Sequence, residues 1–291
     1  MSTPALFKSR SQRRLFLSFS SALTAICFAG TLFIASQAGE PKWFWSTLND
    51  LLVGMVASGA FAIFSMIFIE YFLDPDAAHQ AVVVPAADIE HHLFKIADAA
   101  SSYKIYVRTG RYFRSKILPK LVQNAVSARK PIDVDVVLLD FRNAEVCRQY
   151  AQYREECSFD NVLWSGEYVS TEVLATILAI VQAARENPSV LRVSLSLSSR
   201  LSTFRIEGSA EEMLITREDP KDVAYRYDRS RPEHSAYLTE FDWVSGNADR
   251  IDLTPGMNAN TQLMAIFGSA VTPSQEEAAK ATMKSRAPYG R

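Results

Sequence analysis

Two long apolar segments open the chain, and a mixed apolar and polar pattern follows them. Residues 15–36 and residues 51–69 contain no charged side chain. A membrane core about 30 Å thick is crossed by roughly 20 helical residues, and a helix satisfies its own backbone hydrogen bonds in lipid. The pattern therefore predicts a transmembrane hairpin over residues 15–73, with spans at 15–36 and 51–72.

Charges beside these segments indicate their orientation. Residues 1–14 carry four basic side chains and no acid, whereas the loop at 37–50 holds one lysine against Glu40 and Asp50. Basic flanks stay on the cytoplasmic side of a membrane, so we expect residues 1–14 and everything after the second span to be cytoplasmic. The alternative is a signal peptide cleaved near Ser36-Gln37-Ala38, but the apolar run exceeds the roughly 7–15 residues of such a signal.

Small residues recur every four positions in both predicted spans. The first span carries Ser21, Ala25 and Ala29, and the second carries Gly54, Ser58 and Ala62. This spacing lets helix backbones approach closely, so these residues are predicted to pack membrane helices, either the two spans on each other or those of different copies. Neither apolar run, 15–36 or 51–69, holds a charged residue, which argues against a carrier, and a pore would need several copies.

Beyond the hairpin, the chain reads as a connector at 74–87, a domain at 88–271 and a polar tail at 272–291. Helical periodicity begins at Ile89, with Asp88 at the N-cap position. Strand-like runs alternate with helical runs, and several strand-like runs then follow one another. This order predicts an α/β sandwich with a mixed sheet. The predicted helices after the first are 111–128, 143–157 and 170–186, and the predicted strands are 103–108, 132–139, 191–197, 203–207, 212–217, 222–228 and 235–243.

Composition excludes several classes of function. Residues 75–291 carry 26 Lys and Arg against 28 Asp and Glu, so no overall basic excess points to nucleic acid. Cys27, Cys147 and Cys157 form no Cys-x-x-Cys pair, and His91-His92 are adjacent rather than one helical turn apart, so the sequence predicts no metal site and no cofactor.

One segment of the domain is strongly basic. Residues 103–130 hold eight basic residues and no acid, and Thr109-Gly110 lies between a predicted strand and a predicted helix. A helix N-terminus flanked by arginines binds phosphate through free N–H groups and charge. This favours a site for a nucleotide, a nucleic-acid backbone or a lipid headgroup; the alternative is a solvated helix face with its charges paired elsewhere. The residues of the predicted site are Arg108, Thr109, Gly110, Arg111, Arg114 and Arg205.

Four strand segments carry a family resemblance that covers about residues 88–245. They are YKIYVRTG (103–110), VDVVLLD (134–140), LRVSLSL (191–197) and STFRIEG (202–208), and their order among the helices resembles the phospholipase D-like fold. Active members of that family use His-x-Lys followed by Asp; the histidine attacks a phosphodiester and the lysine stabilises the charge. No histidine here has a lysine two residues later. The resemblance therefore implies a domain that does not hydrolyse phosphodiesters by this mechanism.

Two-span proteins with such a degenerate domain resemble membrane effectors of bacterial anti-phage systems, including those encoded beside retron reverse transcriptases. The resemblance implies a non-enzymatic effector or sensor at the bacterial inner membrane, whose cytoplasmic domain gates membrane disruption by the two helices. Expected partners are membrane lipids, further copies of the chain, and a regulatory protein or a nucleic-acid complex such as a reverse transcriptase with its DNA product. The alternatives are a membrane-tethered nuclease or phospholipase with a non-standard active site, and a passive membrane scaffold.

Overall fold

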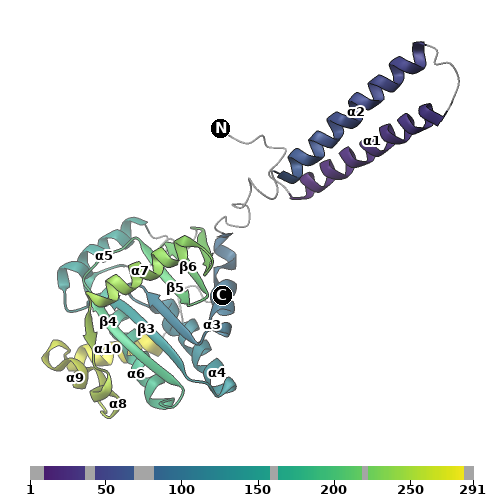
Figure 1. Ribbon diagram of the computed structural model, residues 1–291. Coiled ribbons are helices and arrows are strands. Elements are labelled where there is room, and N and C mark those ends of the chain that lie inside the picture. The colour runs from purple at the N-terminus through teal and green to yellow at the C-terminus, as the bar shows by residue number, and fades with distance from the viewer. Residues whose placement is uncertain (1–9, 37–42, 69–81, 158–162, 218–221, 285–291) are drawn as a thin grey trace. The chain divides into compact units, whose positions relative to one another are not determined.

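The computed structural model describes residues 10–36, 43–68, 82–157, 163–217 and 222–284. The chain forms two compact units, Met1–Gln80 and Ala81–Arg291. Figure 1 shows a helical hairpin in the first unit and a sheet with helices in the second.

The first unit pairs helix α1 (Arg10–Ser36) with helix α2 (Trp43–Phe68). Both are long and apolar enough to cross a membrane, over Leu15–Ser36 and Trp45–Phe68. This confirms two apolar helices able to anchor the chain, although residues 69–72 of the second predicted span lie outside the described residues.

The second helix begins earlier than its predicted span, because no proline or glycine interrupts residues 43–50 and one charge does not end a helix. Asp50 therefore lies within α2 and within the candidate span. The expectation that neither span holds a charged residue is wrong.

The second unit is built on an eight-stranded sheet in the order β1-β7-β6-β5-β2-β3-β4-β8. The central strands β2, β3 and β4 are parallel, and every other neighbouring pair is antiparallel. This confirms the α/β class and the mixed sheet. The strands are β1 (Val82–Val84), β2 (Ser102–Tyr106), β3 (Ile132–Leu139), β4 (Leu191–Ser198), β5 (Phe204–Ser209), β6 (Glu212–Arg217), β7 (Ala224–Asp228) and β8 (Asp249–Ile251).

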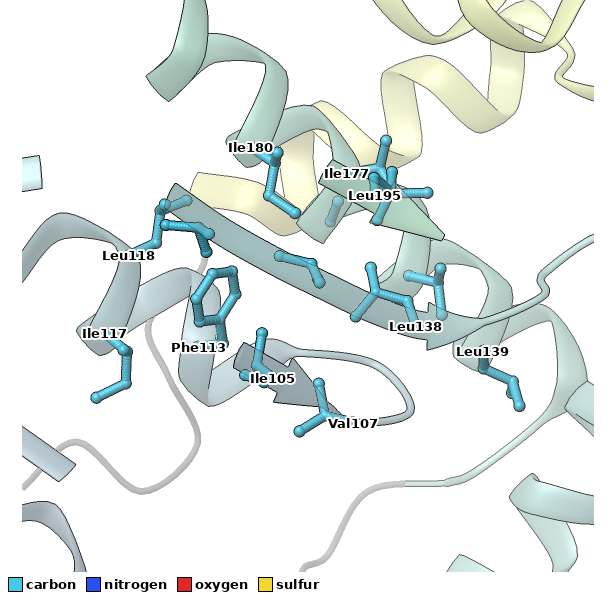
Figure 2. Close-up of a cluster of buried hydrophobic side chains, with 14 of the residues drawn as sticks. Ile105, Val107, Phe113, Ile117, Leu118, Leu138, Leu139, Ile177, Ile180 and Leu195 are labelled. Atoms are coloured by element: carbon cyan, nitrogen blue, oxygen red, sulfur yellow. The ribbon is translucent and has the colours of Figure 1, made fainter. Parts of the chain in front are cut away.

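Helices cover both faces of this sheet, so the unit has three layers. The larger core fills the face under α6, where Ile177 and Ile180 approach Leu138 and Leu195 of the central strands (Figure 2). On the other face, α7 buries Phe241 and Val244 against a smaller apolar cluster. The helices are η4 (Ala86–Asp88), α3 (Ile89–Ala99), η5 (Phe113–Ile117), α4 (Leu118–Ala128), α5 (Ala144–Cys157), α6 (Gly166–Glu186), α7 (Pro232–Gly246), α8 (Thr254–Met257), α9 (Gln262–Phe267), η6 (Gly268–Ala270) and α10 (Pro273–Lys284).

Helix α6 also has the length and the apolarity of a membrane span. Its apolar residues are buried against the sheet and neighbouring helices, including Val173, Ile177 and Val181. In this chain α6 is therefore the central core helix of the α/β unit.

Residues 235–243 were predicted as a strand and this is wrong, because they lie in α7. The buried residues His234, Phe241 and Val244, with partly buried Tyr237 and Leu238 between them, are spaced three or four apart. That is helical periodicity, and Pro232 stands in the first turn, where its missing N–H has no helical partner. Asp88 stands at the N-cap of α3 without a side-chain capping bond.

Residues 111–128, predicted as one helix, form two segments. Residues Phe113–Ile117 are a π-helix, and the Leu118 N–H donates to the Phe113 carbonyl five residues back. The α-helix then restarts with Pro119 in its first turn. Single π-turns of this kind are frequent at functional sites, and this one lies inside the basic segment singled out from the sequence.

Candidate functional site

The basic turn between β2 and η5 is held in place by main-chain bonds. The Val107 N–H donates to the Val137 carbonyl at 3.1 Å, and the Leu139 N–H donates to the Arg108 carbonyl at 2.9 Å. These two bonds continue the parallel pairing past the end of β2. The turn therefore starts from a fixed position at the carboxyl end of the central strands, where ligands of open α/β sheets commonly bind.

Gly110 lets this turn pass close to α6. Its φ of +69° lies in the left-handed region that favours glycine. A Cβ at this position would lie 2.7 Å from Cγ2 of Thr176. The Thr176 hydroxyl donates to the Thr109 carbonyl at 2.6 Å, which fastens the turn to α6.

Two arginines of the turn share one buried carboxylate. Arg111 Nε lies 3.2 Å from Glu172 Oε1, and Arg114 Nη2 donates to Glu172 Oε2 at 2.9 Å. Arg114 Nη1 also donates to the Glu172 carbonyl and to Thr176 Oγ1, each at 3.1 Å. Glu172 is 1% exposed and Arg114 is 8% exposed. Helix α6 thus supplies an internal anion to the segment for which the sequence predicts an external phosphate.

The other residues of the predicted site do not all lie at the same place. Arg108 and Thr109 are buried, and the Arg111 guanidinium lies 5.8 Å from the Tyr168 ring centre. Arg205 stands half-buried on β5, one residue before the pair that joins Ile206 to Tyr106. The structure therefore gathers Thr109, Arg111 and Arg114 at α6, while Arg205 lies on the next strand. Phosphate binding here stays a prediction, and a ligand would meet arginines already paired with Glu172.

Glu172 is the residue of this constellation that the sequence reasoning missed. It follows Arg114 by 58 positions, so no local motif joins them. A signal was nevertheless present, because Glu172 is the only charged residue between Glu167 and Arg185 in an otherwise apolar helix. A lone acid inside a buried helix is rarely left unpaired.

A second charged network lies at the same end of the sheet. Arg142 donates from Nε and Nη2 to the Asp140 carboxylate at 2.8 and 2.9 Å, and from Nη2 to Asp249 at 2.8 Å. Hydrogen bonding to Asp140 raises the pKa of the Arg142 guanidinium, so its charge is held. This network ties the end of β3 to edge strand β8 and occupies Asp140 with an internal partner.

The two helices of the hairpin contact each other at Gly59 and at Gly30. A Cβ on Gly59 would lie 2.0 Å from Thr24 Oγ1, and a Cβ on Gly30 would lie 3.3 Å from Leu52 Cδ1. These contacts, with buried Cys27, define what we call the seam of the hairpin. Of the predicted stripes, Ala62 is partly buried, and the others are exposed: Ser21, Ala25, Ala29, Gly54 and Ser58. Their packing between copies of the chain stays a prediction.

Comparisons of the chain with protein-family models, with curated proteins and with solved structures find no match. Among the residues that the structure describes, no group of three or more His, Cys, Asp or Glu side chains could hold a metal ion. The hairpin and the basic turn are the two features of the chain that point to a function.

Proposed function

We propose that this chain is a membrane-anchored, non-enzymatic effector or sensor whose α/β unit gates membrane disruption by the α1–α2 hairpin. The observation that carries the proposal is the hairpin itself. Its two helices contact each other along the seam, and a row of small residues on α1 lies exposed outside that seam. Such a surface suits close contact with further helices. A passive anchor would need only two apolar spans.

Assembly of several copies is part of this proposal. Two helices packed on each other enclose no pore, so a membrane path requires more than one hairpin. The exposed residues Ser21, Ala25 and Ala29 on α1 supply a surface on which backbones of different copies can approach. A signal received by the α/β unit would change this packing.

The basic turn supports binding by the α/β unit rather than catalysis. Arg111 and Arg114 are the cations best placed to stabilise a phosphoryl group, and both are engaged by Glu172. The sequence also lacks the His-x-Lys pair of active phospholipase D-like enzymes. We therefore propose a degenerate phospholipase D-like domain that recognises a phosphate-bearing ligand or complex.

The biological setting is proposed from the sequence resemblance alone. It is anti-phage defence at the bacterial inner membrane, with the α/β unit in the cytoplasm. The partner would be a regulatory protein or a nucleic-acid complex, such as a reverse transcriptase with its DNA product. The four basic residues before the first candidate span support this orientation.

The test is the membrane potential of bacteria that express the full chain, followed with a potential-sensitive dye. We expect depolarisation with the full chain, and none with residues 81–291, which lack both helices. Cleavage of nucleic acid or phospholipid by the purified chain would replace the proposal with a membrane-tethered enzyme. If the membrane potential stayed unchanged even when the products of neighbouring genes were also expressed, the chain would instead be a passive membrane scaffold.

A further inference from the structure

A groove of about 590 Å³ runs between the two helices of the hairpin. Its α1 wall includes Ser20 and Thr24, and its α2 wall includes Gly54 and Ser58 together with Asp50. A Cβ added to Gly54 would meet nothing within 4 Å, so the groove is open at that point. The groove therefore places small and polar groups beside large apolar ones, which include Phe19, Leu23 and Met55.

Asp50 is the decisive residue of this groove. It is the only charged residue in the two candidate spans, Leu15–Ser36 and Trp45–Phe68. It follows Trp45 by five residues, which is about 7.5 Å along a helix that rises 1.5 Å per residue. Tryptophans favour the membrane–water interface, so Asp50 lies deeper than that interface.

Lipid is an unsuitable occupant for the groove at Asp50. A carboxylate facing acyl chains is strongly unfavourable, and intramembrane acids face water, a cation or a basic partner. Neither candidate span contains Lys, Arg or His. Thr24 donates its hydroxyl hydrogen to the Ser20 carbonyl at 2.8 Å, which leaves its oxygen able to accept from water or to face a cation.

We propose that, in the assembled protein, this groove lines a water-filled path for cations, and that Asp50 makes the path prefer cations over anions. The inference rests on the proposed function, because it assigns the transported species to the same hairpin. Copies arranged around an axis place one groove and one carboxylate each beside the path. A ring of carboxylates at one end of a narrow path attracts cations and repels anions.

The first test asks whether the groove is wet, and it does not depend on current flow. The full chain is placed in membrane vesicles after Cys27, Cys147 and Cys157 are replaced by serine. Single cysteines are then introduced by Gly54→Cys and Ser58→Cys, with Phe61→Cys as the control, because Phe61 is 72% exposed and does not line the groove. A charged, membrane-impermeant thiol reagent should modify the two groove cysteines roughly tenfold faster or more, since only a hydrated thiol ionises readily. Equally slow modification at all three positions would mean that lipid fills the groove and would overturn the inference.

The second test measures ion selectivity of the full chain in planar bilayers under a tenfold KCl gradient. The reversal potential of the wild type should approach the potassium limit of about 59 mV for one charge and a tenfold ratio. Asp50→Asn should move it toward zero, whereas Asp50→Glu should keep it. Glu40→Gln is the matched control, because it removes a carboxylate from the loop between the helices.

The outcomes separate the inference from the proposed function. A current that shows no cation preference, or one that Asp50→Asn leaves unchanged, would overturn the cation path while membrane disruption stands. Absence of current, together with an unchanged potential in bacteria that also express the neighbouring gene products, would overturn the proposed function itself, and the labelling rates would still report whether water enters the groove.

Discussion

Where the turn after β2 meets α6, buried Arg114 and partly buried Arg111 share the buried carboxylate of Glu172. Removing only the glutamate leaves two guanidinium groups without their shared anion, and breaking a buried pair in this way costs about 3–5 kcal/mol. We therefore expect Glu172→Ala to lower the free energy of unfolding of the α/β unit by roughly that amount. Urea unfolding of the full chain in detergent, followed by circular dichroism, measures the change.

The control for this prediction is Glu186→Ala. Glu186 is exposed at the end of the same helix, and a surface change of this kind is expected to stay within about 0.5 kcal/mol. If both variants had the same unfolding midpoint, the Arg111–Glu172–Arg114 cluster would not be a stabilising unit.

Cysteine reactivity gives a second prediction at this scale. Burial raises the pKa of the Cys147 thiol to about 11, and nearby Asp140 adds to the shift. Cys157, in contrast, is exposed. Because the thiolate is the reactive form, iodoacetamide at pH 8 should alkylate Cys157 well before Cys147, as peptide mass spectrometry would show.

The same shift has a consequence for stability. An unfolded chain releases the Cys147 proton near pH 9, whereas the folded chain holds it to about pH 11. The stabilising contribution of the neutral thiol is therefore present below pH 9 and is lost as the pH rises toward 11.

Equal alkylation rates for the two cysteines in the native chain at pH 8 would contradict the burial of Cys147.

At the scale of single elements, Gly54 and Gly59, the two glycines of α2, lie in different surroundings. Gly59 lies at the seam against Thr24, whereas Gly54 faces open space. We expect Gly59→Leu to separate the helices and Gly54→Leu to leave them paired. The measurement is the yield of disulfide between Gly30→Cys and Leu52→Cys, which are neighbours across the seam, in a chain that lacks its native cysteines.

Loss of the disulfide in both leucine variants would contradict this assignment of the seam. Retention of the disulfide in Gly59→Leu would do so as well. Only a selective loss at Gly59 agrees with the contacts between α1 and α2.

Single elements also show how far the sequence predicts this fold. The strands at 132–139 and 212–217 coincide with β3 and β6, because dense β-branched and apolar runs leave little choice of conformation. Helix α7 was missed because its aromatic and apolar residues also fit an alternating pattern over a short window. The short strands β1 and β8 were missed because three residues carry too little periodicity.

The candidate site was predicted only in its local part. The turn at Thr109-Gly110 and its arginines follow from neighbouring residues in the chain. Their pairing with Glu172 depends on how α6 crosses the sheet, which is a tertiary contact without a sequence signature. The position of Asp50 inside α2 was also missed, because a charged residue marks the boundary of the apolar run at 51–69 in the sequence.

For the whole molecule, the two compact units predict independent folding. Both apolar clusters of the α/β unit consist of residues from Val84 onward, so its core needs nothing from the hairpin. We expect residues 81–291 to unfold at the same urea midpoint as the α/β unit of the full chain in detergent. Circular dichroism provides the comparison.

The matched control begins at residue 86 and so lacks β1. Val84 is fully buried and pairs with Ala224 of β7, so this shorter chain should unfold at a lower urea concentration. A midpoint for residues 81–291 far below that of the full chain would show that the hairpin contributes to the fold of the α/β unit.

Strand β1 also bears on how a force would travel through the chain. It is the first regular element that the structure describes after the hairpin, and it is an edge strand of three residues that pairs with β7. Tension between the membrane and the α/β unit would therefore load this short pairing before any central strand. Under such tension β1 would separate from β7 first and could pair with it again afterwards, while β2, β3 and β4 keep the basic turn intact.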